Sequence, residues 1–194
     1  MDYKIRFATP DDRDLIYALK AESVRPYVER IWGWDEDYQR NDFDNDFSAI
    51  DQFHVIESDG NFAGFLQCYF DHPFYEIVEI HLLPEYRGKG IGSGILRYFQ
   101  KVCTAKNRKI RIGCFKDNYR AYNLYQNLGF VQMEETDTHL ILEYGRKASV
   151  ADLIADATSR SNPAQSTSSS GDEQRGLGKD YPTPAPKPKW EHER

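Results

Sequence analysis

Residues 84–96 combine glycines and two basic side chains in a pattern that could bind an anion. The run reads Pro-Glu-Tyr-Arg-Gly-Lys-Gly-Ile-Gly-Ser-Gly-Ile-Leu, after a branched apolar stretch and before apolar residues at helical spacing. The first turn of a helix carries unpaired N–H groups and partial positive charge, so glycines there let the backbone close around a phosphate. Arg87 and Lys89 add positive charge to this loop. The pattern predicts a phosphate-binding loop between a buried strand and a helix.

Two familiar phosphate loops do not fit this spacing. A P-loop needs Gly-x-x-x-x-Gly-Lys-Ser/Thr, whereas Lys89 lies between two glycines without that spacing. A dinucleotide fingerprint needs glycines at i, i+2 and i+5, and its third position falls here on Ser93, Ile95 or Arg97. The pattern that fits is Arg-x-x-Gly-x-Gly, starting at Arg87. The remaining alternative is a glycine-rich turn that packs tightly and binds nothing.

The strand before this loop carries two side chains that could act as a general base. A charge on a buried strand is costly unless it is paired or used, so Glu79 and His81 stand out. Imidazole titrates near neutral pH, which suits a base, although a core histidine bonded to a neighbour is an equal alternative. Glu22 and Glu29 are further candidates from the first helical region. Strict alternation predicts one face with Ile77, Glu79, His81 and Leu83 and the other with Val78, Ile80 and Leu82.

The loop lies in a series of predicted strands and helices. The first helix follows Thr9, and Pro26 is expected to break or kink it. A second helix is expected through Phe43 and Phe47. Strands are expected over residues 3–7, 53–58, 62–70, 77–83, 110–115, 131–135 and 139–144, with helices after the glycine loop and before Gly129. This order indicates a mixed α/β sheet with the loop at its centre.

Residues 27–38 are rich in aromatic side chains. Two tryptophans flank Gly33, which predicts a loop that presents large rings. We expect at least one of Tyr27, Trp32 and Trp34 to line a substrate pocket, with core packing as the alternative. The stretch 35–51 contains seven acidic residues, which favours a cationic substrate if they face the pocket. Such acidic residues more often form a solvated helix face.

Composition and net charge argue against several classes of function. The 194 residues carry a net charge of −6 and a pI near 5.4, which argues against non-specific nucleic-acid binding. Cys68, Cys103 and Cys114 lie in apolar runs without metal-ligand spacing, which predicts reduced core thiols of a cytoplasmic protein and no metal site. We find no signal-peptide pattern and no apolar run long enough for a membrane span, so we expect no membrane partner.

A second motif runs from Asn118 to Phe130, as Asn-x-x-Ala-x-x-x-Tyr-x-x-x-Gly-Phe with Tyr125 at the tyrosine position. This motif and the Arg-x-x-Gly-x-Gly loop resemble the two diagnostic motifs of the GNAT N-acetyltransferase family. The resemblance covers residues 3–146 and implies a mixed, mostly antiparallel central sheet flanked by helices, the acyl-CoA N-acyltransferase fold. It also implies that the fourth and fifth strands splay apart.

The resemblance implies a site for acetyl-CoA as co-substrate and direct attack by an amine. Its catalytic residues would be Tyr125, as general acid, and Glu79, as general base. Substrate would contact Tyr27, Trp32, Trp34 and His81. The cofactor would contact Leu82, Leu83, Arg87, Gly88, Lys89, Gly90, Ile91, Gly92, Ser93 and Asn118.

The sequence therefore predicts an enzyme that acetylates a primary amine of a small molecule or peptide. The alternative is a non-catalytic acyl-CoA sensor with the same fold, which would need neither Tyr125 nor Glu79. The acetyltransferase domain is expected over residues 1–148. Residues 149–194 are expected to form a short helix and then a disordered tail rich in serine and proline. Whether the protein forms a homodimer is left open.

Overall fold

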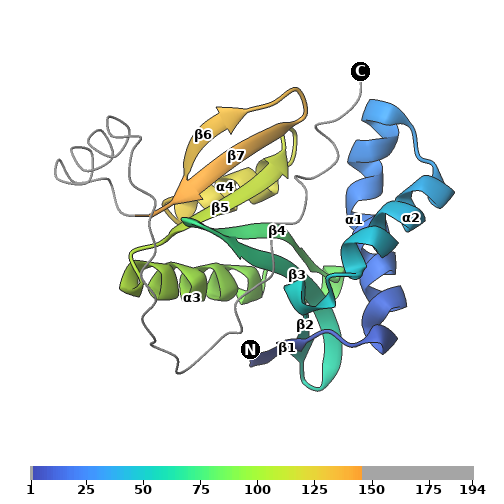
Figure 1. The fold of residues 1–194 in the computed structure, drawn as a ribbon, viewed down its shortest axis with the longest axis horizontal. Coiled ribbons are helices and arrows are strands. Elements are labelled where there is room, and N and C mark those ends of the chain that lie inside the picture. Colours follow the sequence, from blue (N-terminus) through green and yellow to red (C-terminus); the bar gives the residue numbers. More distant parts are fainter. Residues whose placement is uncertain (1, 146–194) are drawn as a thin grey trace, which may run out of the picture. The chain divides into compact units, whose positions relative to one another are not determined.

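Seven strands and four α-helices form the fold within residues 2–145, the part of the chain that the computed structural model describes (Figure 1). The strands are β1 (Tyr3–Phe7), β2 (Phe53–Ser58), β3 (Asn61–Asp71), β4 (Phe74–Leu82), β5 (Lys109–Phe115), β6 (Val131–Glu135) and β7 (His139–Tyr144). The helices are α1 (Arg13–Trp32), α2 (Glu36–Phe47), α3 (Ile91–Ala105) and α4 (Tyr119–Asn127). The predicted order of elements is confirmed. The predicted boundary at residue 148 and the tail beyond it lie outside the described residues.

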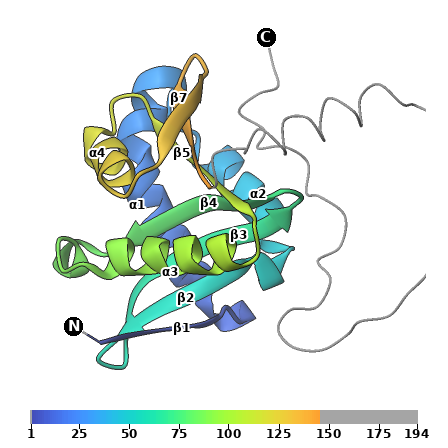
Figure 2. The ribbon, with the colours of Figure 1, turned by 90° about the vertical axis from the view of Figure 1, so that its left-hand side faces the viewer.

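The strands form one sheet in the order β1-β2-β3-β4-β5-β7-β6. Figure 2 shows β1, β2, β3 and β4 following one another in this sheet. Every neighbouring pair is antiparallel except β4 and β5, which are parallel. Parallel strands need a crossover connection, and α3 supplies it. The mixed, mostly antiparallel sheet is therefore confirmed. Within residues 2–145, no helix has the length and apolar character to cross a membrane.

Helices pack on both faces of the sheet and create two cores. α3 and α4 cover one face, where Ile95 and Tyr125 are buried with residues of β3, β4 and β5. α1 and α2 cover the other face, where Ile16 and Phe43 are buried with Phe65 of β3. We call these the α3 face and the α1 face. The glycine loop leads from the end of β4 into α3, so it lies at the centre of the sheet order.

A β-bulge changes which side chains of β4 share a face. Gln67 of β3 lies opposite Glu79, but the next residue, Cys68, lies opposite Ile77, so Val78 is the extra residue. The bulge puts Ile77 in the α3-face core, while Glu79 and His81 lie on the α1 face. The predicted strict alternation is therefore wrong for Ile77, because alternation does not continue through a bulge.

β4 and β5 pair with each other over only part of their length. The paired stretch ends where Ile77 lies opposite Ile112, although β4 continues to Leu82 and β5 to Phe115. We call the two unpaired stretches, residues 78–82 and 113–115, the fork. The expected splaying of these strands is confirmed by this register. In the described chain, the fork leaves main-chain groups of both strands without ladder partners on their facing edges.

Pro26 does not break α1, which continues to Trp32. The missing N–H of Pro26 leaves only the Glu22 carbonyl without its helical partner. Both residues are exposed, so water can satisfy that carbonyl, while buried Val28 anchors the following turn. The expected break does not occur, the alternative of a kink stays a prediction, and Tyr27 lies on a helix rather than in a loop.

We expect Gly64→Ala to lower the free energy of unfolding by about 3 kcal/mol, because overpacking against backbone cannot relax. A Cβ at Gly64 would lie 2.1 Å from the His81 carbonyl oxygen. Urea denaturation measures this loss. Gly94→Ala is the matched control, since its Cβ would meet the Tyr3 hydroxyl, the far end of a side chain rather than backbone, at 2.8 Å and should cost less. Equal stability of the two variants would contradict this packing argument.

Candidate active site

The glycine loop leaves open space in front of the α3 N-terminus. Gly88 and Gly90 have φ values of 74° and 85°, a region that favours glycine. A Cβ built at Gly88, Gly90 or Gly92 would meet nothing within 4 Å. The alternative of a turn that packs tightly does not fit this open surface. An anion can therefore approach the free N–H groups of the first helical turn.

The two basic side chains of the loop have different environments. Arg87 folds back and donates from Nε to the Leu82 carbonyl oxygen at 2.6 Å, which fixes the loop to the end of β4. The Lys89 ammonium lies 5.6 Å from the centre of the Tyr86 ring. Lys89 is exposed, so its charge can reach an anion in the loop.

Other predicted cofactor residues already have main-chain partners. The Leu83 N–H donates to the Ala63 carbonyl at 2.9 Å, and its carbonyl accepts from Tyr86. The Leu82 carbonyl is bonded to Arg87, so Leu82 and Leu83 have few main-chain groups free for a cofactor. The edge of β4 that lacks a strand partner lies in the fork. Ile91 is buried in the α3-face core, so only its N–H can serve an anion, whereas Ser93 is half-buried in the first turn.

Asn118 caps α4. Its Oδ1 accepts from the Ala121 N–H at 3.1 Å, as an N-cap residue does. Its own N–H donates to the carbonyl of Phe115, the last residue of β5. The Asn118 side-chain amide N–H groups therefore remain for a ligand at the end of the fork.

Tyr125 lies in the α3-face core with 5% of its surface exposed. Its ring packs 5.9 Å from that of Phe130, and it lies beside Cys114 near the end of β5. Burial raises the pKa of the Tyr125 hydroxyl far above its usual value. The hydroxyl makes no hydrogen bond within residues 2–145. It therefore stays protonated at all working pH values and is free to donate.

Glu79 lies between two basic side chains. Lys20 Nζ of α1 is 2.5 Å from Glu79 Oε1, and His81 Nε2 is 3.3 Å from Glu79 Oε2. The second contact is close, but Oε2 has no hydrogen bond among the described residues. Burial alone would raise the pKa of Glu79, but Lys20 and His81 outweigh it and lower the pKa to about 2. Glu79 is therefore ionised near neutral pH.

The predicted aromatic residues are not brought together. Tyr27 stacks on Phe115 at 4.6 Å, which places it beside the fork, and burial raises its pKa. Arg30, one turn along α1, pairs with Asp117 and holds the helix against the same end of β5. Trp32 is 50% exposed at the end of α1.

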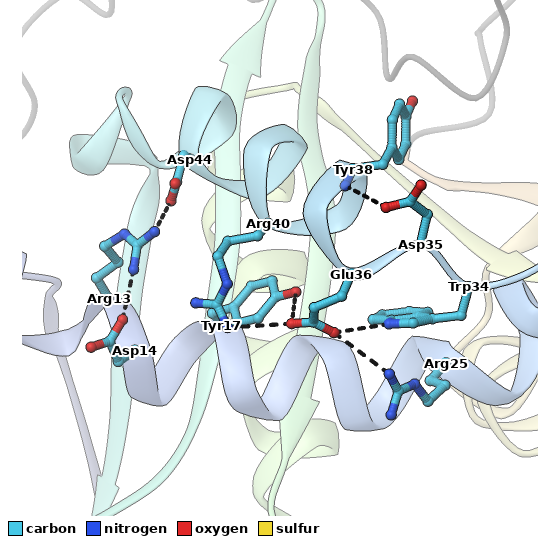
Figure 3. Close-up of polar contacts among 10 residues, drawn as sticks. All are labelled: Arg13, Asp14, Tyr17, Arg25, Trp34, Asp35, Glu36, Tyr38, Arg40 and Asp44. Atoms are coloured by element: carbon cyan, nitrogen blue, oxygen red, sulfur yellow. Dashed lines mark hydrogen bonds and ion pairs between the residues drawn. The ribbon is translucent and has the colours of Figure 1, made fainter.

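Trp34 belongs to a polar cluster on the other side of α1 (Figure 3). Its Nε1 donates to Glu36 at 2.9 Å, and its ring lies under the Arg25 guanidinium at 4.6 Å. Glu36 also accepts from Tyr17 at 2.8 Å and from Arg40 at 3.3 Å. Arg25 and Tyr27 project from opposite sides of the helix, so Trp34 faces away from the fork. Glu36 is exposed, as expected for a solvated helix face, and its carboxylate also joins α1 to α2.

Glu22 and Glu29 project from the side of α1 opposite Lys20, which contacts Glu79. Together with Arg25 and Glu36 they line a groove of about 520 Å³ on the outer side of α1. Lys20, in contrast, projects from α1 toward the sheet. Sequence reasoning missed Lys20, although one signal was present, since Lys20 follows Ile16 and Leu19 on the buried face of the helix.

Residues 16–130 match the model of the acetyltransferase (GNAT) family. The chain belongs to this family. The chain is 33% identical over 140 residues to an uncharacterized N-acetyltransferase of Archaeoglobus fulgidus. The match covers 63% of this chain and 88% of that relative. The two motifs read from the sequence thus lie within a recognised GNAT domain.

Solved N-acetyltransferase structures share the fold. The PaiA N-acetyltransferase of Thermoplasma acidophilum, solved with coenzyme A, superimposes with a TM-score of 0.61 at 20% identity, covering 75% of this chain and 100% of that one. The ribosomal-protein-S18-alanine N-acetyltransferase of Escherichia coli gives a TM-score of 0.54 at 15% identity, covering 74% and 94%. At these identities the likeness supports the fold alone.

We expect Glu79→Gln to lower the free energy of unfolding at pH 7 by about 3 kcal/mol, because Lys20 is left buried without its closest partner. The folded pKa of Glu79, about 2, lies below the unfolded value of 4.5, so this stabilisation is present above pH 4.5 and is lost as pH falls toward 2. Urea denaturation at pH 7 and pH 3 measures the difference, which should shrink at pH 3. Glu57→Gln, at a surface pair with Arg6, is the control. An equal deficit at both pH values would contradict the assignment.

Proposed function

We propose that this GNAT protein transfers the acetyl group of acetyl-CoA to a primary amine by direct attack. The observation that carries the proposal is the open glycine loop at the α3 N-terminus, next to the unpaired fork of β4 and β5. The loop suits a pyrophosphate, and the fork suits an extended arm that pairs with main-chain groups. Membership of the family and the N-acetyltransferase relative support the same reaction.

The chain's own groups would hold acetyl-CoA at both features. N–H groups of residues 88–93 would bind the pyrophosphate, with Lys89 adding charge and Arg87 fixing the loop. Main-chain groups of the fork and the Asn118 amide would hold the arm. When bound, acetyl-CoA supplies an acetyl thioester that an amine can attack.

We assign proton removal to the Glu79–His81 pair. Glu79 has a pKa of about 2 and is a weak base by itself near neutral pH. His81 lies beside it, and its Nδ1 makes no hydrogen bond within the described residues, so Nδ1 can take the proton of the amine. The Glu79 carboxylate would stabilise the resulting imidazolium, as carboxylates do in catalytic triads.

Two donors complete the site. A main-chain N–H of the fork would stabilise negative charge on the carbonyl oxygen. The Tyr125 hydroxyl, buried and permanently protonated, would donate to the departing sulfur. Tyr27, stacked at the end of the fork, would form one wall for the acceptor.

The acceptor is a primary amine of a small molecule or of a peptide. A structural neighbour is named for acetylating an alanine of ribosomal protein S18, which makes a peptide α-amine one class to test. The acidic groove on the outer side of α1 lies away from the fork, so it gives no preference for a cationic acceptor at the reacting centre.

The proposal is tested by release of free CoA thiol with a panel of small-molecule and peptide amines, together with calorimetry of acetyl-CoA binding. Turnover with one amine class is the expected result. Binding without turnover across the panel would favour a non-catalytic acyl-CoA sensor. Absence of binding would overturn the assignment of the loop.

Gly92→Ala should weaken acetyl-CoA binding about tenfold without lowering stability. Its Cβ would fill the open space where the anion would lie, yet alanine suits a helix better than glycine does. Calorimetry and urea denaturation measure the two effects. Gly94→Ala, two residues further along α3 and packed on Tyr3, is the control and should keep its affinity. Unchanged affinity in Gly92→Ala would contradict the loop's role.

Tyr125→Phe should lower kcat about 100-fold, because one donor to developing charge is lost. Affinity for acetyl-CoA should stay within about twofold, since the ring and its packing remain. Steady-state kinetics and calorimetry on the same sample measure both. Tyr122→Phe, on the same helix and bonded to Gln132, is the matched control. An unchanged kcat in Tyr125→Phe would remove Tyr125 from the mechanism.

A further inference from the structure

Lys20 reaches from α1 into the centre of the candidate site. Its side chain is 14% exposed, and its ammonium lies 2.5 Å from Glu79 and 3.8 Å from Asp46 of α2. The Phe43 ring lies 6.0 Å away on the apolar side of the ammonium. A lysine rarely occupies such a position without a partner, so this contact is specific rather than a surface ion pair.

Lys20, Glu79 and His81 form an array in which charge alternates. Lys20 contacts one carboxylate oxygen of Glu79, and His81 lies beside the other at 3.3 Å. Exposure rises along the array, from 14% for Lys20 and 16% for Glu79 to 21% for His81. His81 is the most exposed of the three side chains, so we place the acceptor at its imidazole.

The charges around His81 come from three elements. Its own strand supplies Glu79, α1 supplies Lys20, and α2 supplies Asp46 and Asp42 behind Lys20. β3 supplies uncharged neighbours, the Phe65 ring at 5.3 Å and Gln67 opposite Glu79. With Lys20 present, the charge of Glu79 is compensated when His81 is neutral. Without Lys20, the bare carboxylate would favour the imidazolium, which cannot accept a proton.

We propose that Lys20 is a positioning residue that acts through Glu79 to keep His81 neutral, and so able to accept a proton, near neutral pH. The inference rests on the proposed function for its catalytic meaning, but the charge state of His81 can be measured without turnover. Lys20 touches neither the acceptor nor acetyl-CoA in this proposal. A purely structural ion pair would affect stability and leave the titration of His81 unchanged.

The test is NMR titration of the histidine ring resonances in the full chain, with His81 assigned by loss of its signal in His81→Gln. Lys20→Met should move the midpoint of the His81 titration to higher pH by about one pH unit, since a neighbouring charge shifts a titration midpoint by about one to three pH units. Glu79→Gln should move it in the opposite direction, because the carboxylate that favours the imidazolium is removed. The two opposite shifts keep the proposal testable if either variant fails to fold.

Two controls separate this effect from loosened packing. Lys20→Arg keeps the charge and should restore the midpoint. Arg13→Met breaks the pair that joins α1 to Asp44 of α2 without touching Glu79, and it should leave the midpoint unchanged. The acidic limb of the pH profile of kcat/KM should move in parallel with the His81 midpoint.

The outcomes are distinguishable. A His81 midpoint that does not respond to Lys20→Met or Glu79→Gln would overturn the inference, whether or not the protein turns over. A midpoint that moves while the limb of kcat/KM stays fixed would support the effect of Lys20 on His81 but count against His81 as the base. Absence of turnover in the wild-type chain with every amine would count against the proposed function alone.

Discussion

The parting of β4 and β5 is the constraint on which the candidate site depends. Two parallel strands would normally continue their ladder, because unpaired main-chain groups are costly. Here pairing stops at Ile77 and Ile112, directly before the bulge at Val78 that redirects β4. The free edges therefore need another partner, and the glycine loop at the end of β4 presents an open helix terminus beside them.

α1 supplies the wall that makes this fork into a reaction site. Its buried side carries Lys20 to Glu79 and Tyr27 to Phe115, so one helix is fixed to both strands of the fork. Its outer side joins α2 through the cluster around Glu36 (Figure 3). An ion pair inside and a hydrogen-bonded cluster outside thus hold the helix, and the charge state of the candidate base depends on where the helix lies.

The sequence was sufficient for features that depend on local chemistry. The glycine loop, the order of elements and the Asn118 to Phe130 motif follow from short-range patterns of residue type. The face of Ile77 could not be predicted, because a bulge is a property of pairing with β3. The contact of Lys20 with Glu79 joins residues 59 positions apart, so only the fold reveals it. Pro26 failed as a breaker because exposure and the packing of Val28 outweigh one lost hydrogen bond.

Amide hydrogen exchange with and without acetyl-CoA tests most directly whether the loop and the fork form one binding site. Exchange reports which main-chain N–H groups gain hydrogen-bond partners on binding. We predict slower exchange in residues 88–93 and in the fork, residues 78–82 and 113–115, with little change in β1 or β6. Protection confined to other segments, or no protection at saturating acetyl-CoA, would contradict the proposal that this parted sheet is an acetyl-CoA site.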